Sequence, residues 1–251
     1  MDKNESKITW KGVKKQIMEF TKSIGSYHVG LLYGDNNKLM LTDLKGREVY
    51  ELWESDKFDD TLWAIEFVNN DIYFGGADKK ITRLFEGKIY ERSDSIHSIL
   101  NFNNKVYDAG SYGIIETESN RTIVSKDEME NENISCIDTL FKTKYKDKDM
   151  LACGVTYKDN THGIWVVDVE NHKLLKEIRR YEKKLITLTW QAFYWNGDIV
   201  SCVYKEYLTI NDERIKNTEI NIFDGNISRV VPVIDKNGKE WFYYCLLYTS
   251  P

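Results

Sequence analysis

The sequence has few prolines, cysteines and histidines, and each shortage argues against a class of structure or site. Its 251 residues include 2 Pro, 4 Cys and 4 His. No CxxC pair occurs and no cysteine stands at ligand spacing from a histidine, so the sequence predicts neither a disulfide framework nor a zinc site. The motifs G-x-S-x-G, H-E-x-x-H, G-x-G-x-x-G and G-x-x-x-x-G-K-[ST] are absent as well. We expect no metal or organic cofactor.

A basic excess and long apolar segments are also missing. The chain has 35 Lys+Arg against 40 Asp+Glu, a formal net charge of -5, whereas general nucleic-acid and membrane-surface binders are basic. No apolar run approaches the ~20 residues that span a bilayer. The polar residues 1–5 lack the hydrophobic region of a signal peptide. We therefore expect a cytoplasmic protein that binds neither nucleic acid nor membranes.

Short β-branched and aromatic segments separated by turn residues make up most of the chain. For example, residues 72–74 precede the Gly/Asp-rich turn 75–78, and a further run follows at 81–85. This pattern favours antiparallel strands joined in hairpins, and the predicted fold class is all-β. Residues 13–20 are the one helix candidate, and the lysine-rich stretch 142–148 is interpreted as a solvated loop.

The predicted strands repeat along the sequence. Residues 62–83 align with residues 96–117 at an offset of 34 residues. The strand before each Gly/Asp-rich turn marks one unit, and these strands begin near Val29, Ile72, Val106, Leu151 and Ile199. Their spacing averages roughly 40–45 residues, which is typical of four-stranded β-propeller blades.

We therefore predict a single WD40-like β-propeller domain over residues 1–251. Its approximate blades are 14–56, 60–93, 95–130, 134–182, 185–234 and a partial 240–251. A propeller closes its ring to remove exposed sheet edges. The last unit stops in mid-blade, so either residues 8–10 close the ring from the N-terminus or the chain is truncated. We favour truncation and expect about five blades plus a partial sixth, from a truncated seven-blade ring.

Small residues recur at matching positions of the predicted second strands, namely Gly75, Ala109, Cys153 and Cys202. Tightly packed blades need small side chains at such positions. The cysteines are accordingly interpreted as packing residues rather than reactive thiols.

Two resemblances to known families follow from these segments. Residues 76–86 resemble the WD-repeat pattern Gly-Ser-x-Asp-x-x-Ile-x-Leu-Trp-Asp, with Phe-Glu in place of Trp-Asp. Residues 53–67 and 72–78 are similar to the stretch of diphthine methyl ester hydrolases in which a Trp, His-Asp-Phe-Glu and a second Trp precede Ser-Gly-Gly-Asp-Asp. Residues 95–112 are similar to that family's following blade. The similarity covers roughly residues 50–210 and rests on the collinear order of the segments.

The sequence departs from the family pattern at three places. Asp56-Lys57 stands near the position of the His in His-Asp-Phe-Glu, Gly113 is the fourth residue where the family has Gly-Ser-Tyr-Asp, and residues 204–207 replace Phe-Tyr-Asp-His. The resemblance implies an enzyme that removes a methyl ester from diphthine on translation elongation factor 2, in diphthamide biosynthesis, without a cofactor. The alternative is a non-catalytic WD40-repeat scaffold that binds other proteins.

Ester hydrolysis needs an activated water or nucleophile, and histidines and carboxylates at the mouth of the channel are the natural suppliers. We predict three catalytic candidates. His97 lies on a predicted innermost strand, and the alternative is a structural histidine. His162 lies in a predicted hairpin turn beside Asp159, and the alternative is a solvated turn. Asp78 occupies the WD-type turn, where its carboxylate alternatively caps backbone N–H groups.

Residues on the predicted rim are candidates for contact with the substrate or partner. Asp59, Asp60 and Trp63 form a loop cluster just before a predicted first strand, and loops at one rim bear the function of propellers. Trp63 is alternatively a core residue. Tyr112, in the turn that resembles Gly-Ser-Tyr-Asp, is the fourth candidate. The sequence leaves the oligomeric state open.

Overall fold

The structure is a computed structural model. It describes residues 30–35, 38–43, 49–54, 62–69, 71–181, 192–195, 197–204, 207–210, 213–214, 226–234, 237–238 and 240–247. The helix candidate at 13–20 lies outside these residues. No helix among the described residues is long and apolar enough to cross a membrane.

The described residues form antiparallel β-sheets whose strands follow one another in chain order. Three consecutive sheets contain four strands each and hold the central part of the chain. Their strands are β4 (Leu62–Val68), β5 (Asp71–Gly76), β6 (Lys80–Arg83) and β7 (Lys88–Glu91); β8 (Ile96–Phe102), β9 (Lys105–Gly110), β10 (Gly113–Glu116) and β11 (Arg121–Val124); and β12 (Ile134–Tyr145), β13 (Lys148–Tyr157), β14 (His162–Asp168) and β15 (Lys173–Tyr181).

Further sheets flank these three on both sides. One sheet precedes them, a fourth four-stranded sheet follows them, and a strand pair ends the described chain. Their strands are β1 (Gly30–Asp35), β2 (Lys38–Asp43) and β3 (Val49–Glu54); β16 (Ala192–Trp195), β17 (Asp198–Tyr204), β18 (Tyr207–Ile210) and β19 (Glu213–Arg214); and β20 (Asn226–Ile234) and β21 (Glu240–Leu247).

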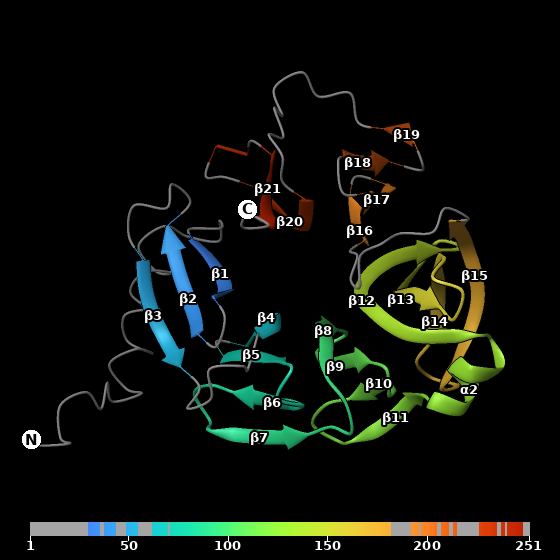
Figure 1. Cartoon of the computed structure of the whole chain (residues 1–251), viewed down its shortest axis with the longest axis horizontal. Helices are drawn as coiled ribbons and strands as arrows, with labels where there is room; N and C mark the ends of the chain where they lie inside the picture. Colours follow the sequence, from blue (N-terminus) through green and yellow to red (C-terminus); the bar gives the residue numbers. More distant parts are fainter. Residues whose placement is uncertain are drawn as a thin grey trace, which may run out of the picture.

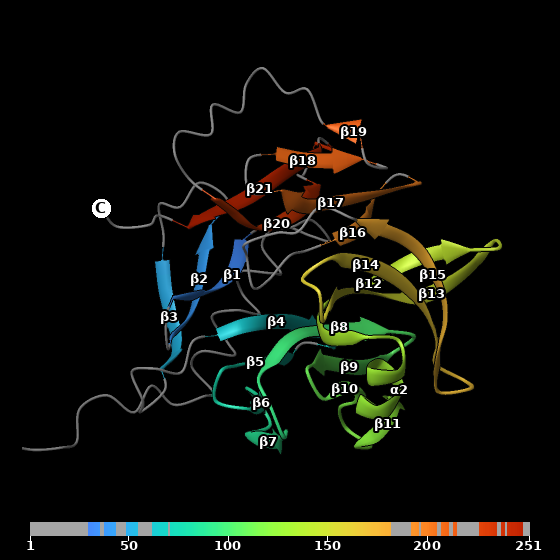
Figure 2. The same ribbon diagram turned by 45° about the vertical axis from the view of Figure 1, so that its right-hand side comes forward.

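The sheets are arranged about a common centre (Figure 1). The first strands β4, β8 and β12 lie nearest the centre, and β7, β11 and β15 lie at the periphery. First strands of successive sheets contact one another: β4 contacts β8, β8 contacts β12, and β12 contacts β16. The turned view in Figure 2 shows the same succession of sheets. The predicted all-β class with repeated four-stranded antiparallel sheets is confirmed, and the arrangement is compatible with a β-propeller-like fold.

The structure bears out the 34-residue repeat in the first and second strands, whereas β10 and β11 begin 33 residues after β6 and β7. β4 and β8 begin 34 residues apart, at Leu62 and Ile96, and β5 and β9 keep the same offset. A two-residue turn joins β8 to β9, and its residues Asn103 and Asn104 have φ angles of 51° and 60°. Asparagine tolerates this left-handed conformation, which two-residue hairpin turns of type I′ require at both positions. Local turn chemistry thus fixes the register of these hairpins.

The small residues of the second strands are packed as predicted. Ala109 and Cys153 are fully buried. At Gly75, a Cβ atom would lie 2.5 Å from the carbonyl oxygen of Lys80 on the neighbouring strand, so only glycine fits there without displacing the backbone. The side chain of Cys202 lies outside the described residues.

The structure differs from the sequence interpretation in three segments. The lysine-rich stretch 142–148 is not a loop, because β12 and β13 extend through it and pair up to Tyr145 and Lys148. A short helix, α2 (Lys126–Asn131), follows β11, and the Ser125 hydroxyl accepts a hydrogen bond from the Glu128 N–H as its N-cap. Strand β20 pairs with β21 rather than with the preceding sheet, to which residues 226–234 were assigned.

A buried ion pair joins the β4–β7 sheet to the β8–β11 sheet. Arg92, which follows β7, donates from Nε and Nη2 to the two carboxylate oxygens of Asp108 on β9, both at 2.7 Å. The hydroxyls of Tyr112 and Thr117 donate to the same carboxylate at 2.6 and 2.8 Å. The Arg92 and Asp108 side chains are only 2% and 0% exposed. Four donors therefore compensate the charge of a carboxylate that has no access to water.

Candidate functional site

Irregularities in the first strands determine where the candidate site forms. In β4 the regular pairing with β5 is interrupted between Leu62 and Ala64, and Trp63 is the extra residue. In β8 the interruption makes His97 the extra residue. In β12 one of two such interruptions makes Asp138 the extra residue. Because a β-bulge redirects side chains near the ends of strands, these three residues leave the ordinary alternation of their strands.

The bulges bring a histidine, a thiol and a carboxylate together between β8 and β12. The Nδ1 atom of His97 lies 3.0 Å from the Cys136 sulfur and 3.5 Å from Oδ1 of Asp138. The imidazole is 14% exposed and the carboxylate is fully buried. The Trp63 ring packs edge-on against the imidazole, with ring centroids 5.3 Å apart. Side chains from three successive sheets therefore meet around His97.

The same carboxylate connects His97 to the second predicted histidine. The Thr156 hydroxyl on β13 donates to Oδ2 of Asp138 at 2.6 Å and lies 3.0 Å from Nδ1 of His162. Since a hydroxyl has one proton, donation to Asp138 leaves the Thr156 oxygen to accept from His162, which assigns the imidazole proton to Nδ1. Burial lowers the pKa of His162, against a smaller raising effect of the Asp138 and Asp159 carboxylates. His162 is therefore a neutral, buried support of the site.

The thiol of Cys136 is not an activated nucleophile in this arrangement. Burial raises its pKa, and the neighbouring Asp138 carboxylate raises it further, whereas a hydrogen bond with Ser111 acts in the opposite direction. A thiol that retains its proton at neutral pH reacts slowly, because the thiolate is the nucleophile. Cys136 thus requires a cation, or another change in its surroundings, before it can act as a thiolate.

The remaining predicted residues lie apart from this cluster or outside the described residues. The Asp78 carboxylate accepts a hydrogen bond from the Lys80 N–H at 3.2 Å in the turn between β5 and β6. Tyr112 is buried, and its hydroxyl donates to Asp108. Asp59 and Asp60 lie outside the described residues. Of the predicted site residues, His97, His162 and Trp63 are brought together.

Sequence reasoning missed Cys136, Asp138 and Thr156. Neither Cys136 nor Asp138 was predicted as a site residue. One signal was available, because Cys136 and Asp138 stand two residues apart at the beginning of a predicted first strand, where a regular strand would place both on one face. The bulge at Asp138 and the approach of β8 to β12 arise only in the folded chain, so the sequence alone did not reveal them.

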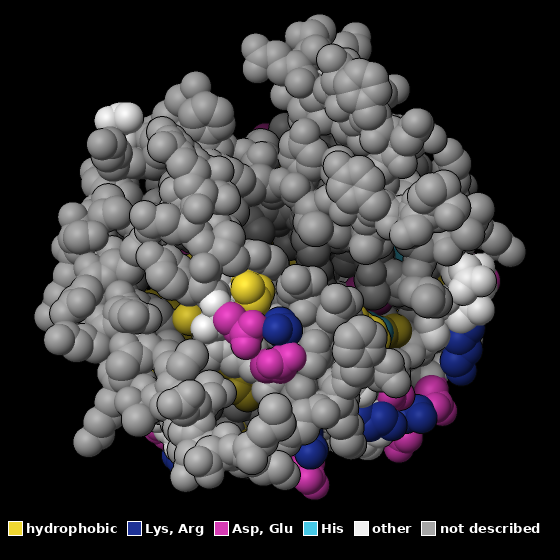
Figure 3. Space-filling view, turned by 60° about the vertical axis from the view of Figure 1, so that its left-hand side comes forward, with side chains coloured by type: hydrophobic (Ala, Val, Ile, Leu, Met, Phe, Trp, Pro, Cys, Tyr) yellow, Lys and Arg dark blue, Asp and Glu magenta, His cyan; other side chains and the backbone are white. Residues whose placement is uncertain are grey.

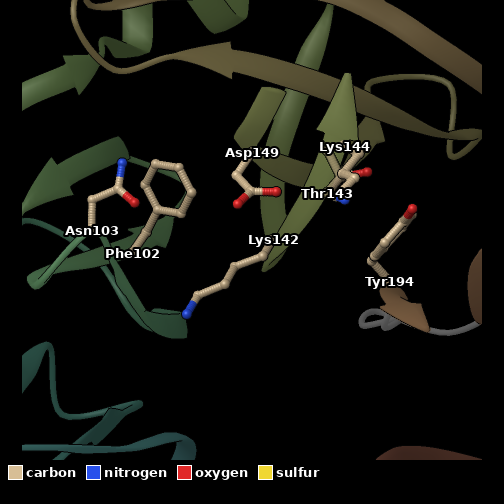
Figure 4. Close-up of a pocket in the computed structure, with 7 residues that line it drawn as sticks. All are labelled: Phe102, Asn103, Lys142, Thr143, Lys144, Asp149 and Tyr194. Carbon is tan, nitrogen blue, oxygen red and sulfur yellow. The ribbon is translucent and has the colours of Figure 1, made fainter. Parts of the chain in front are cut away.

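An open pocket lies at the other end of the first strands. It is bounded by side chains at the end of β8, on the β12–β13 hairpin and on β16, namely Phe102, Asn103, Lys142, Thr143, Lys144, Asp149 and Tyr194 (Figure 4). On the face in Figure 3, acidic and basic side chains of the described residues lie next to one another. The mixture of charges does not define an anion site or a cation site.

The comparisons with known proteins concern the fold alone. No protein-family model matches the chain, and no curated protein matches it. The chain is similar to the crystal structure of an extracellular domain ascribed to a hybrid two-component system of B. thetaiotaomicron, with a TM-score of 0.53 and 13% identity over 85% of this chain. This chain spans 30% of the length of that protein.

Two computationally designed proteins match less closely. The Ika8 protein has a TM-score of 0.47 and 13% identity, with 89% of this chain and 72% of that chain covered. The Ika4 protein has a TM-score of 0.41 and 15% identity, with 64% and 96% covered.

Proposed function

We propose that the protein is a carboxylic-ester hydrolase on a WD40-like β-propeller, and that its substrate is the methyl ester of diphthine on translation elongation factor 2. The proposal combines two independent supports. One is the collinear resemblance over roughly residues 50–210. The other is that His97, which was predicted from its place on an innermost strand, lies against Asp138 and Cys136 between two first strands.

The propeller is part of the proposal. In support, four-stranded antiparallel sheets follow one another in chain order, and their first strands lie side by side. The exact 34-residue offset between β4–β5 and β8–β9 supports one repeated unit. In a propeller the first strands line the central channel, so a substrate side chain entering the channel would reach the end of β8 where His97 lies.

The reaction is a simple hydrolysis. The oxygen of a water molecule bonds to the ester carbon, the bond between that carbon and the methoxy oxygen breaks, and methanol leaves with one proton. The products are a carboxylate, methanol and a released proton. The protein must activate the water and stabilise the negative charge on the carbonyl oxygen in the transition state.

The His97 cluster holds the groups that hydrolases use for the first task. Imidazole and carboxylate side chains in contact activate water either as a general base or as ligands of a metal ion. The Trp63 ring restrains the imidazole from one side, and Asp138 restrains it from another. The Thr156 hydroxyl in turn holds the carboxylate, and His162 holds the Thr156 hydroxyl.

Mass spectrometry of the substrate tests the function. Elongation factor 2 that contains methylated diphthine is incubated with the full chain, and we expect the modified peptide to lose the mass of one CH₂ group. The variant His97→Gln should lose this activity, and His172→Gln, an exposed histidine in the β14–β15 turn, should retain it. No loss of mass with folded protein would refute the hydrolase and favour the scaffold.

A further inference from the structure

We propose that His97, Cys136 and Asp138 form a zinc-binding site. One ligand atom of each side chain, namely Nδ1, Sγ and a carboxylate oxygen, lies within 4.8 Å of the other two. The Nδ1–Sγ and Nδ1–Oδ1 distances are 3.0 and 3.5 Å. In tetrahedral zinc sites with bonds of about 2.0–2.3 Å, ligand atoms lie roughly 3.3–3.8 Å apart. A zinc ion therefore fits among the three atoms after small side-chain movements.

A second observation at Asp138 points to a missing positive charge. Its carboxylate is fully buried, and Oδ2 accepts the hydrogen bond from Thr156. Oδ1, which lies 3.5 Å from Nδ1 of His97, has no partner with good hydrogen-bond geometry among the described residues, and the Cys136 thiol is the other group that interacts with this carboxylate. A buried carboxylate oxygen without a donor is costly, and a cation bound to it would remove that cost.

The set of donors favours zinc over magnesium or calcium. Thiolate and imidazole ligands suit zinc, whereas magnesium and calcium prefer sets of oxygen atoms. With the Cys136 thiolate, the Asp138 carboxylate and a neutral imidazole, a divalent ion gives a site with no net charge, which suits its burial. Binding displaces the thiol proton, so a thiol that is inert in the metal-free protein becomes a ligand.

Three protein ligands leave one position of a tetrahedral ion open. This is the pattern of catalytic rather than structural zinc, and the fourth ligand is then water. Thr156 is a positioning residue, because its hydroxyl binds Oδ2 of the carboxylate ligand and it would not itself be a ligand. The binding site stands on the contacts alone, and only the role of the zinc-bound water in ester hydrolysis rests on the proposed function.

Cobalt(II) titration tests the site without any substrate. The full chain is treated with a chelator, titrated with Co²⁺, and followed by its near-ultraviolet thiolate-to-cobalt absorption; Zn²⁺ should then displace the cobalt. We expect Cys136→Ser to abolish the absorption and Cys153→Ala, at a fully buried packing cysteine, to preserve it. Thr156→Val should weaken binding by about 10–100-fold. No absorption in the wild type, or absorption that survives Cys136→Ser, would overturn the site.

A thermal-shift measurement keeps the test valid if a variant folds poorly. Zinc should raise the melting temperature of the wild type and of Cys153→Ala, but not that of His97→Gln or Asp138→Asn. An equal rise in all four proteins would overturn the assignment. Zinc binding without ester hydrolysis would support the zinc site and refute the proposed function. Ester hydrolysis by protein that binds no zinc would support the proposed function and refute the zinc site.

Discussion

Replacing Asp108 with alanine should be among the most destabilising single changes in the described part of the chain. The carboxylate of Asp108 accepts hydrogen bonds from Arg92, Tyr112 and Thr117, and the change removes all of them at once. The guanidinium of Arg92 is left 2% exposed. The other groups that interact with it carry no charge, namely the backbone carbonyl of Glu91, the side-chain amide oxygen of Asn120 and the Tyr112 hydroxyl.

The expected loss of stability follows from the charge of Arg92, which stays buried when Asp108 is removed. Removing one partner of a buried ion pair costs about 3–5 kcal/mol, because the other partner is then buried without compensation. Asp94→Ala is the matched control, since its side chain is 50% exposed and lies 4.0 Å from Lys79. Exposed pairs contribute about 0–1 kcal/mol. The two Asp→Ala variants should therefore differ by at least about 2 kcal/mol.

Urea unfolding followed by tryptophan fluorescence and circular dichroism measures both variants. The double variant Arg92→Met/Asp108→Ala should lose less stability than the sum of the two single variants, because it leaves no charge behind. If Asp108→Ala and Asp94→Ala unfold at the same urea concentration, the reasoning from burial and charge is refuted.

Three further changes have expected outcomes that urea titration can check. Gly113 has a φ of 114°, and a Cβ there would overlap the Val124 carbonyl oxygen. Gly113→Ala should therefore cost well over the roughly 1 kcal/mol expected for Gly87→Ala, where no atom lies within 4 Å; equal losses would contradict this. Ser125→Ala removes the N-cap of α2 and should cost about 1 kcal/mol, whereas Ser125→Asp should restore most of the loss. Burial raises the pKa of Glu66 from 4.5 to about 7. The folded state then holds a proton that the unfolded state has lost, so the unfolding free energy should fall by up to about 3 kcal/mol between pH 4.5 and 7 and level off above. Glu66→Gln should abolish this contribution, and an unchanged pH dependence would argue against it.

The sheets were predictable from the sequence because their signals are local. The paired asparagines before β9 and the short apolar and aromatic runs of the strands specify hairpins without reference to distant residues. Gly75 and Ala109 occupy equivalent positions of two second strands, and both positions are tightly packed and take small residues. The helix α2 was missed although Ser125 and Glu128 form a capping signal, because strand patterns surround it on both sides.

The site was predictable only in part, because strand irregularities assemble it. His97 was identified from its expected place on a first strand. Its partners Cys136 and Asp138 come from the next sheet, and the bulge that turns Asp138 toward His97 has no signature in the sequence. Tyr112 was predicted from its place in a turn to contact a partner. In the structure it is buried, and its hydroxyl donates a hydrogen bond to the buried Asp108.

Diffraction at the zinc absorption edge tests most directly whether His97, Cys136 and Asp138 form one functional centre. Crystals of the full chain are grown with zinc, and an anomalous difference map is calculated. The contacts predict a peak about 2.0–2.3 Å from Nδ1, Sγ and a carboxylate oxygen of the three residues. A zinc-loaded crystal with peaks only at other positions, and none among these three side chains, would contradict the assignment.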